Sequence, residues 1–316
     1  MSQPVKMVFL DAVTVEPVDN LSEISTLGDY TGYEITRPAE RIERIKGHNV
    51  VITNKVVIDR DVMDACPELE LVCIVATGMN NVDLDYAAKK GIPVKNVAGY
   101  STESVTQCTF SLLFYLMNAS RYYDDYVKSG QYAASPVFTH LGREFWELAG
   151  KRFGIVGMGT IGKRVAEVAS AFGAKVAYTS TSGKNLEVAG YPHLPLEELL
   201  QTADVVSVHC PLNDRTRNLL TESRLRMMKP TAYLLNMGRG GIVDETALAR
   251  ILDENCIAGA ALDVLSVEPI VPDSPLLKIR HQGKLFITPH IAWASIEARR
   301  LLITRTAQNI KNYFDK

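Results

Sequence analysis

A glycine motif between a strand pattern and a helix pattern constrains the fold of this chain more than any other feature. Gly157, Gly159 and Gly162 follow the apolar run Phe153–Val156. They precede a helical pattern whose apolar face consists of Ile161, Val165, Val168, Ala169 and Phe172. In this context the first glycine allows a tight turn, the second lets a pyrophosphate approach the backbone, and the third lets the helix pack on the strand.

The helix that begins at Thr160 and Ile161 would offer its N-terminal N–H groups to the phosphates. The alternative interpretation is a glycine-rich turn with no ligand. Six strand candidates separated by helical patterns favour the dinucleotide site, because six is the strand number of a complete dinucleotide-binding sheet. They are Phe153–Val156, Lys175–Thr179, Val205–Cys210, Ala232–Met237, Ala258–Val264 and Leu285–Thr288.

The first hundred residues show the same alternation of strand and helix patterns, which indicates βαβ units and a parallel sheet. The strand candidates are Met7–Leu10, Tyr33–Thr36, Val50–Thr53, Leu71–Ala76 and Val94–Asn96. Helical patterns lie at Ser22–Thr26 and Asp83–Lys89. A long apolar helix is predicted over Ser101–Lys128, and an amphipathic helix over Ile291–Lys316.

Domain boundaries are predicted near Gly99 and near His290. They define one domain of residues 99–290, inserted between residues 1–98 and 291–316 of another. A cleft between two α/β domains is a favoured position for a ligand.

Composition excludes several classes of protein. A net charge of −2 is incompatible with a broad basic surface for nucleic acid. No apolar run approaches the roughly 18 residues of a membrane helix, and the first residues lack the apolar core of a signal peptide. The five cysteines form no C-x-x-C pair, so we expect reduced thiols, a cytoplasmic protein and no metal site.

The second strand of the inserted domain lacks the acidic residue that usually holds the adenosine ribose of NAD. No Asp or Glu occurs from Ala174 to Asn185, where hydroxyl residues and Lys184 follow the strand. Ser180 and Lys184 could accept a 2′-phosphate, so we expect NADP to be tolerated or preferred over NAD. The alternative is an ordinary polar loop with weak selectivity.

Chemically active side chains follow three later strands of the same predicted sheet, at the edge where such sheets bind ligands. Arg239 could grip a carboxylate with two hydrogen bonds and polarise a neighbouring carbonyl. His290 could donate a proton to that carbonyl oxygen during reduction. Glu268 could accept a hydrogen bond from the histidine, orient its ring and favour its protonated form, and Asp263 is placed to meet a nicotinamide.

Each of these residues also has a structural interpretation: a solvated arginine, a glutamate in a turn, a histidine at a hinge. Their joint position at strand ends favours catalysis. His209, with Cys210 and Pro211, is expected to shape the adenosine pocket, and we assign Thr216, Met237 and Gly238 to the cofactor as well. We interpret the remaining histidines as structural: His48, His140, His193 and His281.

Taken together, the motifs resemble those of the D-isomer-specific 2-hydroxyacid dehydrogenases over nearly the whole chain. The matching stretches are Gly157–Gly162, His209–Leu212, Asn236–Glu245, Ala261–Val264, Glu268–Pro269 and Thr288–Ala292. The resemblance implies Arg239 on the substrate, His290 as acid and base, and Glu268 in support. It implies two doubly wound α/β domains, with a Rossmann cofactor domain inserted in a discontinuous, flavodoxin-like substrate domain.

The family also suggests a substrate loop in Val75–Asp83. Backbone N–H groups around Thr77 and Gly78 could bind the substrate carboxylate opposite Arg239, and domain closure would then exclude water. The alternative is a plain strand-to-helix turn. The resemblance further implies a homodimer, with the apolar helix after Ser101 in the interface, or else as a long core helix.

Two stretches, Ala76–Asn81 and His290–Arg299, resemble hydroxypyruvate reductases, also called glycerate dehydrogenases. The chain ends at Lys316 without a regulatory extension, which argues against the longer phosphoglycerate dehydrogenases. We therefore expect a small 2-oxo or 2-hydroxy acid substrate, best matched by hydroxypyruvate or glyoxylate. The alternatives are a D-lactate or broad 2-oxo-acid reductase and, from another class, a dinucleotide-sensing binding protein.

Overall fold

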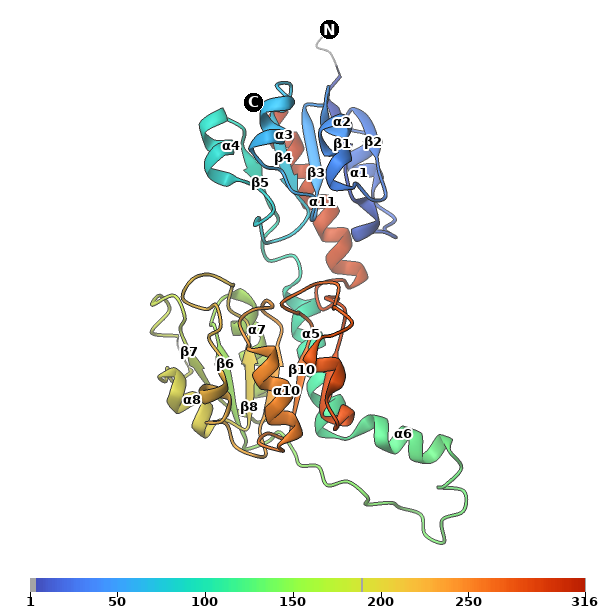
Figure 1. Ribbon diagram of the computed structural model, residues 1–316, viewed down its shortest axis with the longest axis vertical. Coiled ribbons are helices and arrows are strands. Elements are labelled where there is room, and N and C mark those ends of the chain that lie inside the picture. Colours follow the sequence, from blue (N-terminus) through green and yellow to red (C-terminus); the bar gives the residue numbers. More distant parts are fainter. Residues whose placement is uncertain (1–3, 189, 316) are drawn as a thin grey trace. The chain divides into compact units, whose positions relative to one another are not determined.

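Every strand in the computed structural model pairs in parallel, and the strands form two separate sheets (Figure 1). The structure describes residues 4–188 and 190–315. The chain divides into two compact units, one reaching up to Ser101 and resuming at Ala294, the other spanning Thr102–Trp293. These borders lie within a few residues of those predicted near Gly99 and His290.

The first unit contains a five-stranded sheet in the order β2-β1-β3-β4-β5, the flavodoxin-like order. Its strands are β1 (Lys6–Phe9), β2 (Asp29–Gly32), β3 (Val50–Thr53), β4 (Leu71–Ile74) and β5 (Val94–Lys95). Its helices are η1 (Ala12–Thr14), α1 (Ser22–Ser25), η2 (Pro38–Glu40), α2 (Arg41–Ile45), α3 (Arg60–Ala65), α4 (Leu84–Lys90) and α11 (Ile296–Phe314). The helix α11 contacts α1 and β4, so the C-terminal segment completes the unit that the N-terminal segment begins.

The second unit contains a six-stranded sheet in the order β11-β10-β9-β8-β6-β7. Its strands are β6 (Arg152–Val156), β7 (Lys175–Thr179), β8 (Val205–Val208), β9 (Tyr233–Asn236), β10 (Gly259–Leu262) and β11 (Leu285–Ile287). Its helices are α5 (Thr102–Met117), α6 (Ser120–Lys128), α7 (Thr160–Ala171), α8 (Leu196–Thr202), α9 (Glu222–Leu225), α10 (Glu245–Asp253), η3 (Pro275–Lys278) and η4 (Gln282–Lys284).

The strand order of the second unit reverses at β6, which lies between β7 and β8. A parallel bridge between Tyr178 and His193 adds one further pairing outside β7. With this bridge, the unit has the order of a Rossmann sheet, and the glycine motif after β6 lies at the switch point where such sheets bind ligands.

Alternate residues of each strand in this sheet enter two hydrophobic cores. Val156 and Leu234 join a cluster with α8, α9 and α10, whereas Phe153 and Leu235 join a cluster with α5 and α7. Helices thus cover both faces, as a doubly wound fold requires.

Most predicted elements differ from the structure by one or two residues at their ends, and three differ by more or are interrupted. The strand expected at Tyr33–Thr36 is β2 at Asp29–Gly32, an edge strand with no fully buried residue, so its apolar pattern is weak. The helix expected over Ser101–Lys128 is broken, because Ala119 adopts a left-handed φ of 48°. The C-terminal helix begins at Ile296, where the Ser295 side chain accepts a hydrogen bond from Ala298 N.

The helix α5 buries eight of its residues, among them Phe110 and Leu113, in the core of its own unit. The prediction that this segment is a core helix therefore describes the buried face of α5.

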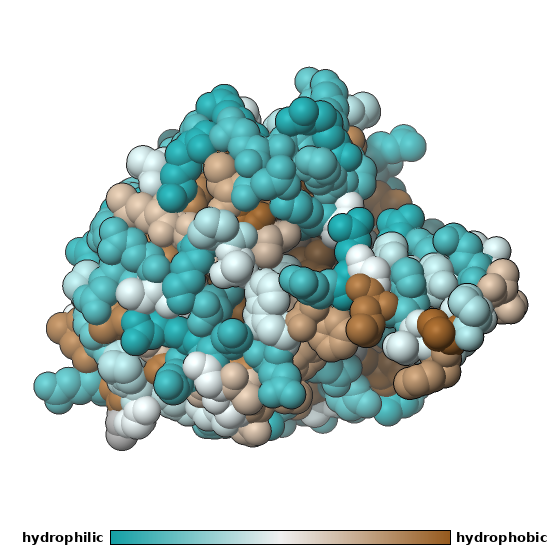
Figure 2. Space-filling model, turned by 90° about the horizontal axis from the view of Figure 1, so that it is seen from below, coloured by the Kyte–Doolittle hydropathy of each residue, from teal (hydrophilic) through white to brown (hydrophobic). Residues whose placement is uncertain are grey.

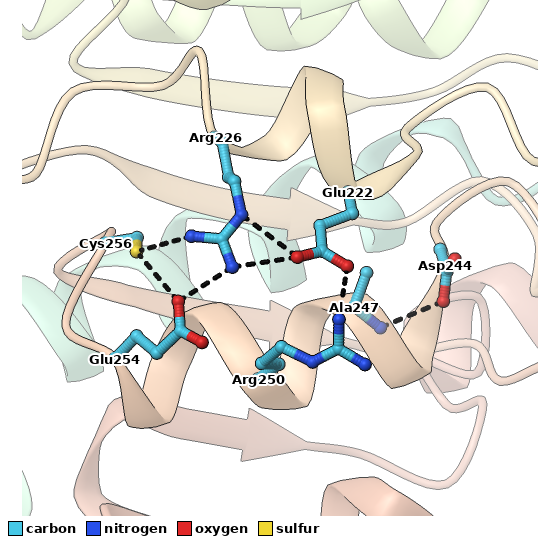
Figure 3. Close-up of polar contacts among 7 residues, drawn as sticks. All are labelled: Glu222, Arg226, Asp244, Ala247, Arg250, Glu254 and Cys256. Atoms are coloured by element: carbon cyan, nitrogen blue, oxygen red, sulfur yellow. Dashed lines mark hydrogen bonds and ion pairs between the residues drawn. The ribbon is translucent and has the colours of Figure 1, made fainter.

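An ion-pair network ties α9 to α10 on the second unit (Figure 3). Glu222 binds Arg226 and Arg250, and Arg226 also binds Glu254. At the N-terminus of α10, the Asp244 side chain accepts a hydrogen bond from Ala247 N at 2.9 Å. The network and the cap fix the helix that follows the β9 loop, the loop that carries Arg239.

All five cysteines are unpaired, as predicted, and three of them are buried. Among the described residues, no helix is both long and apolar enough to span a membrane.

Candidate active site at the carboxyl edge of the second sheet

The glycine loop after β6 has the geometry that its spacing predicts. Gly157 has a φ of 101°, and a Cβ on it would lie 2.8 Å from the Cys210 backbone nitrogen. A Cβ on Gly162 would lie 2.2 Å from the Gly157 carbonyl oxygen, so α7 can pack this closely only on a glycine. Around Gly159, by contrast, no described atom beyond its chain neighbours lies within 4 Å of the Cβ position.

A pocket of about 490 Å³ opens beside this loop and the first turns of α7. Its lining includes Gly159, Thr160, Lys163 and Arg164. Backbone N–H groups of a helix N-terminus and the Lys163 ammonium suit a pyrophosphate. The Arg164 guanidinium is paired with Glu103 and Glu167. The residues present therefore fit the dinucleotide that the motif predicts.

We expect Gly159→Ala to weaken the binding of a nicotinamide dinucleotide by about tenfold or more, without loss of thermal stability. Apart from atoms of Gly159 and its chain neighbours, the added methyl group meets no described protein atom within 4 Å. It would occupy the side from which the phosphates are expected to approach. Calorimetric titration and thermal unfolding measure the two effects. Gly162→Ala is the contrasting variant, since its methyl group collides with backbone and should lower Tm. Unchanged affinity in Gly159→Ala would contradict the assignment.

The loop after β7 folds around its own hydroxyl groups. The Ser180 hydroxyl donates to the Lys184 carbonyl, and Lys184 N donates to Ser182 Oγ at 3.1 Å. Asn185 Nδ2 donates to the Met158 carbonyl at 3.3 Å and so joins this loop to the glycine motif. This role of Asn185 could not be predicted from the sequence, because the contact joins two loops separated by α7.

The loop after β8 carries four residues that we assigned to the cofactor. Burial lowers the pKa of His209 to about 3, so its ring is neutral at physiological pH, and Nε2 lies 2.8 Å from Ser207 Oγ. Burial raises the pKa of the Cys210 thiol to about 11. The buried Thr216 hydroxyl donates to the Pro211 carbonyl at 2.6 Å, so Thr216 braces the loop from within.

Hydrogen bonds of the residues that precede Arg239 hold the loop after β9 in place. Met237 N donates to the Val208 carbonyl, and Gly238 N donates to Asn236 Oδ1. The buried Asn236 side chain also donates to the Arg239 carbonyl at 3.0 Å. Arg239 is half-buried, with Nη1 donating to the Gly238 carbonyl at 2.8 Å. Asn236 is thus a bracing residue to which the sequence motif alone assigned no role.

Gly240 brings this loop against the loop that follows β10. A Cβ on Gly240 would lie only 1.9 Å from the Leu265 carbonyl oxygen. Gly241 N also donates to Ser266 Oγ at 3.1 Å. The loops that carry Arg239 and Glu268 are therefore packed backbone to backbone.

Glu268 and His290 form the hydrogen bond that the sequence predicts. His290 Nδ1 lies 2.7 Å from Glu268 Oε2, and Glu268 Oε1 accepts from Leu265 N at 2.9 Å. The ring is thus oriented by a carboxylate that is itself anchored to backbone. No residue that the structure describes hydrogen-bonds His290 Nε2, so this nitrogen can exchange a proton with a ligand.

Asp263 holds the turn that carries His290. It is 3% exposed, and its carboxylate accepts from Thr288 Oγ1, Ile291 N and Ala292 N at 2.7, 2.8 and 3.0 Å. His290 has a left-handed φ of 56°, a conformation that costs energy for a residue with a side chain. The Asp263 carboxylate stabilises this strained turn; its contact with a nicotinamide stays a prediction.

Thr77 and Gly78 lie in the first unit, in the loop that follows β4. The Thr77 carbonyl accepts from Asn96 Nδ2 at 2.6 Å, and its hydroxyl donates to Val97 O. Within residues 4–188 and 190–315, the backbone N–H groups of Thr77 and Gly78 have no protein acceptor. Two such N–H groups can bind an anion, and their assignment to the substrate carboxylate stays a prediction.

The family model for the NAD-binding domain of D-isomer-specific 2-hydroxyacid dehydrogenases matches residues 110–292 of the chain. A hydroxypyruvate reductase of Blautia hydrogenotrophica is 35% identical over 313 residues, which cover 98% of this chain and 96% of the relative. A glycerate dehydrogenase of Methylorubrum extorquens is 34% identical over 312 residues, with the same coverages.

Among solved structures, the chain is similar to an NADPH-dependent glyoxylate/hydroxypyruvate reductase of Sinorhizobium meliloti in complex with NADP and malonate. The TM-score is 0.83 at 26% identity, over 99% of this chain and 94% of that one.

Proposed function

Because the chain belongs to the D-isomer-specific 2-hydroxyacid dehydrogenase family, we propose that it reduces a small 2-oxo acid to the D-2-hydroxy acid with NADH or NADPH. Hydroxypyruvate and glyoxylate are the proposed substrates. Support for them comes from the relatives, which are named as reductases of these acids or as glycerate dehydrogenase.

The observation that carries the proposal is the pair of His290 and Glu268, beside the loop of Arg239. The three residues follow β11, β10 and β9, which are adjacent parallel strands, so their loops share one edge of the sheet. The 2.7 Å hydrogen bond directs Nδ1 to the carboxylate and leaves Nε2 for the substrate. A cation for a carboxylate and an oriented acid–base group are what reduction of a 2-oxo acid requires.

The proposed roles follow from these positions. The bound dinucleotide supplies a hydride to the carbonyl carbon. Arg239 binds the substrate carboxylate with two parallel hydrogen bonds and polarises the neighbouring carbonyl. His290 donates the Nε2 proton to the carbonyl oxygen, while Glu268 stabilises the positive charge on the ring before the transfer.

The test is the loss of reduced-nicotinamide absorbance with four acids: hydroxypyruvate, glyoxylate, pyruvate and phosphohydroxypyruvate. Each is combined with NADH and with NADPH. The proposal predicts the highest kcat/KM with hydroxypyruvate or glyoxylate. Turnover of pyruvate alone would keep the chemistry and replace the substrate with that of a D-lactate dehydrogenase. Dinucleotide binding without turnover of any of the four acids would favour a sensing protein.

The same proposal includes a homodimer, formed through the arm of residues 118–147. Every residue of this arm is at least partly exposed. Figure 1 shows α6 and the following segment reaching away from the sheet of the second unit. Figure 2 shows hydrophobic side chains on the surface of this arm. The apolar side chains include Phe138, which is 89% exposed, and Leu141, which is 82% exposed.

Internal contacts keep the arm ordered despite its exposure. The His140 ring stacks on Tyr126 with 3.8 Å between centroids, and His140 Nε2 lies 2.7 Å from the Tyr122 hydroxyl. A preformed arm with an apolar surface suits burial against a second copy of the chain.

A cytoplasmic location also belongs to this proposal and rests on the five unpaired cysteines.

We expect the double substitution Phe138→Asp and Leu141→Asp to convert a dimer into a monomer of 34.9 kDa. Two carboxylates in an apolar interface would be desolvated without partners. Light scattering after size-exclusion chromatography gives the mass. The matched control is Ile35→Asp, at a 65% exposed apolar residue of the other unit, and it should stay dimeric. A monomeric wild type, or a dimeric double variant, would refute the role of the arm.

A further inference from the structure

The loop that follows β7 is the part of a Rossmann site that distinguishes NADP from NAD, because the adenosine ribose lies there. In this chain the loop contains no carboxylate from Ser180 to Asn185. The hydroxyl of Ser180, however, donates to the carbonyl of Lys184 within the same loop. Its proton is therefore committed to the fold of the loop and is not available to a 2′-phosphate.

Arg215 lies against this loop, although it comes from the loop after β8. Its Nη1 donates to the Ser182 carbonyl at 3.2 Å. The two loops also meet at a second place, since the Thr181 side chain lies beside the Cys210 thiol. The guanidinium thus lies beside the segment that follows β7, where the ribose hydroxyls are expected.

The backbone of Arg215 is fixed on both sides. Asn213 Oδ1 accepts from Arg215 N at 2.9 Å. The next residue, Thr216, is fully buried and donates to the Pro211 carbonyl. Since the arginine is anchored by its neighbours, binding a ligand costs less conformational entropy than it would on a mobile loop.

The charge of Arg215 is not neutralised within the protein. None of the ion pairs in the described part of the chain includes Arg215, not even with Asp214 beside it in sequence. One of its N–H donors is used on Ser182, and a guanidinium has several more in a planar fork that matches a phosphate. Lys184, exposed in the facing loop, adds a second positive charge.

We propose that Arg215 binds the 2′-phosphate of NADP(H), and that it is the main residue through which this chain prefers NADPH to NADH. The inference rests on the dinucleotide site of the proposed function and adds the residue that selects the dinucleotide. Lys184 and Ser182 contribute less, because an ammonium lacks the planar fork of a guanidinium and the serine hydroxyl carries no charge.

The test measures binding by calorimetry, without turnover. The probes are NADPH, NADH, adenosine 2′,5′-bisphosphate and adenosine 5′-phosphate. The variants are Arg215→Ala and Arg215→Lys, with Arg217→Ala as the matched control, since Arg217 is an exposed arginine of the same loop. Thermal unfolding verifies that each variant is folded.

We expect wild type to bind NADPH more tightly than NADH. Arg215→Ala should lose on the order of 10–100-fold in affinity for NADPH and for the bisphosphate. Its affinity for NADH and for adenosine 5′-phosphate should change less than about twofold, and Arg215→Lys should be intermediate, because lysine keeps the charge without the fork. Arg217→Ala should bind all four probes like wild type.

Equal losses for NADPH and NADH in Arg215→Ala, or no loss for either, would overturn the inference. So would a wild type that binds NADH more tightly than NADPH. Failure of the proposed function would give a different result. The protein would still bind NADPH more tightly than NADH, but it would reduce no 2-oxo acid.

Discussion

Replacing His290 with alanine should lower kcat by about 10²–10⁴-fold and leave dinucleotide binding unchanged. The imidazole is the group that transfers the proton, and a methyl side chain cannot replace it. Stopped-flow assays at saturating substrate give kcat, and calorimetry gives the dinucleotide affinity. Because His290 has a left-handed φ, His290→Asn is the second variant, since asparagine tolerates this conformation better than alanine does.

The matched control is His281→Ala, at an exposed histidine of the same unit. It should turn over like wild type. Glu268→Gln should lie between wild type and His290→Ala, because the amide still accepts a hydrogen bond but carries no charge to stabilise the imidazolium. Wild-type turnover in both His290 variants would remove this residue from the mechanism.

Replacing Arg239 with alanine should lower kcat/KM by about 10²–10⁴-fold, through a large rise in KM and a fall in kcat. The substrate carboxylate loses two charge-assisted hydrogen bonds, and the carbonyl loses the adjacent cation. Initial rates over a wide substrate range separate the two effects. Arg239→Lys should recover only part of the loss, since an ammonium cannot bind a carboxylate through two parallel N–H groups.

Guanidinium ions added to Arg239→Ala provide the control for folding. They should restore part of the activity if the variant has kept its loop, which Asn236 and Gly240 hold independently of the arginine side chain. An unchanged KM for the 2-oxo acid would contradict the assigned role of Arg239.

The sequence predicted the features that depend on local pattern. The strands Val50–Thr53 and Lys175–Thr179 have the predicted bounds. Both contain β-branched or aromatic residues, and both are flanked by residues that favour turns. The hydrogen bond between Glu268 and His290 could also be predicted, since parallel strands place their carboxyl ends at one edge.

Features that depend on tertiary contacts were not predictable. The break at Ala119 has no glycine or proline to announce it, and β2 is defined by its pairing with β1 more than by its own residues. The contact of Arg215 with Ser182 joins two loops of different βα units, which no spacing rule connects. Likewise, the three hydrogen bonds of Asp263 to the turn of His290 become visible only once β10 and β11 are paired.

The most direct test of the central claim follows the hydride itself. Reduced dinucleotide deuterated at nicotinamide carbon 4 is mixed with the protein and hydroxypyruvate, and the product is examined by NMR and chiral chromatography. We predict D-glycerate with deuterium at carbon 2, from the isotopomer with the label on the transferred face. A product without deuterium at carbon 2 from either labelled face, or L-glycerate, would contradict direct hydride transfer at this site.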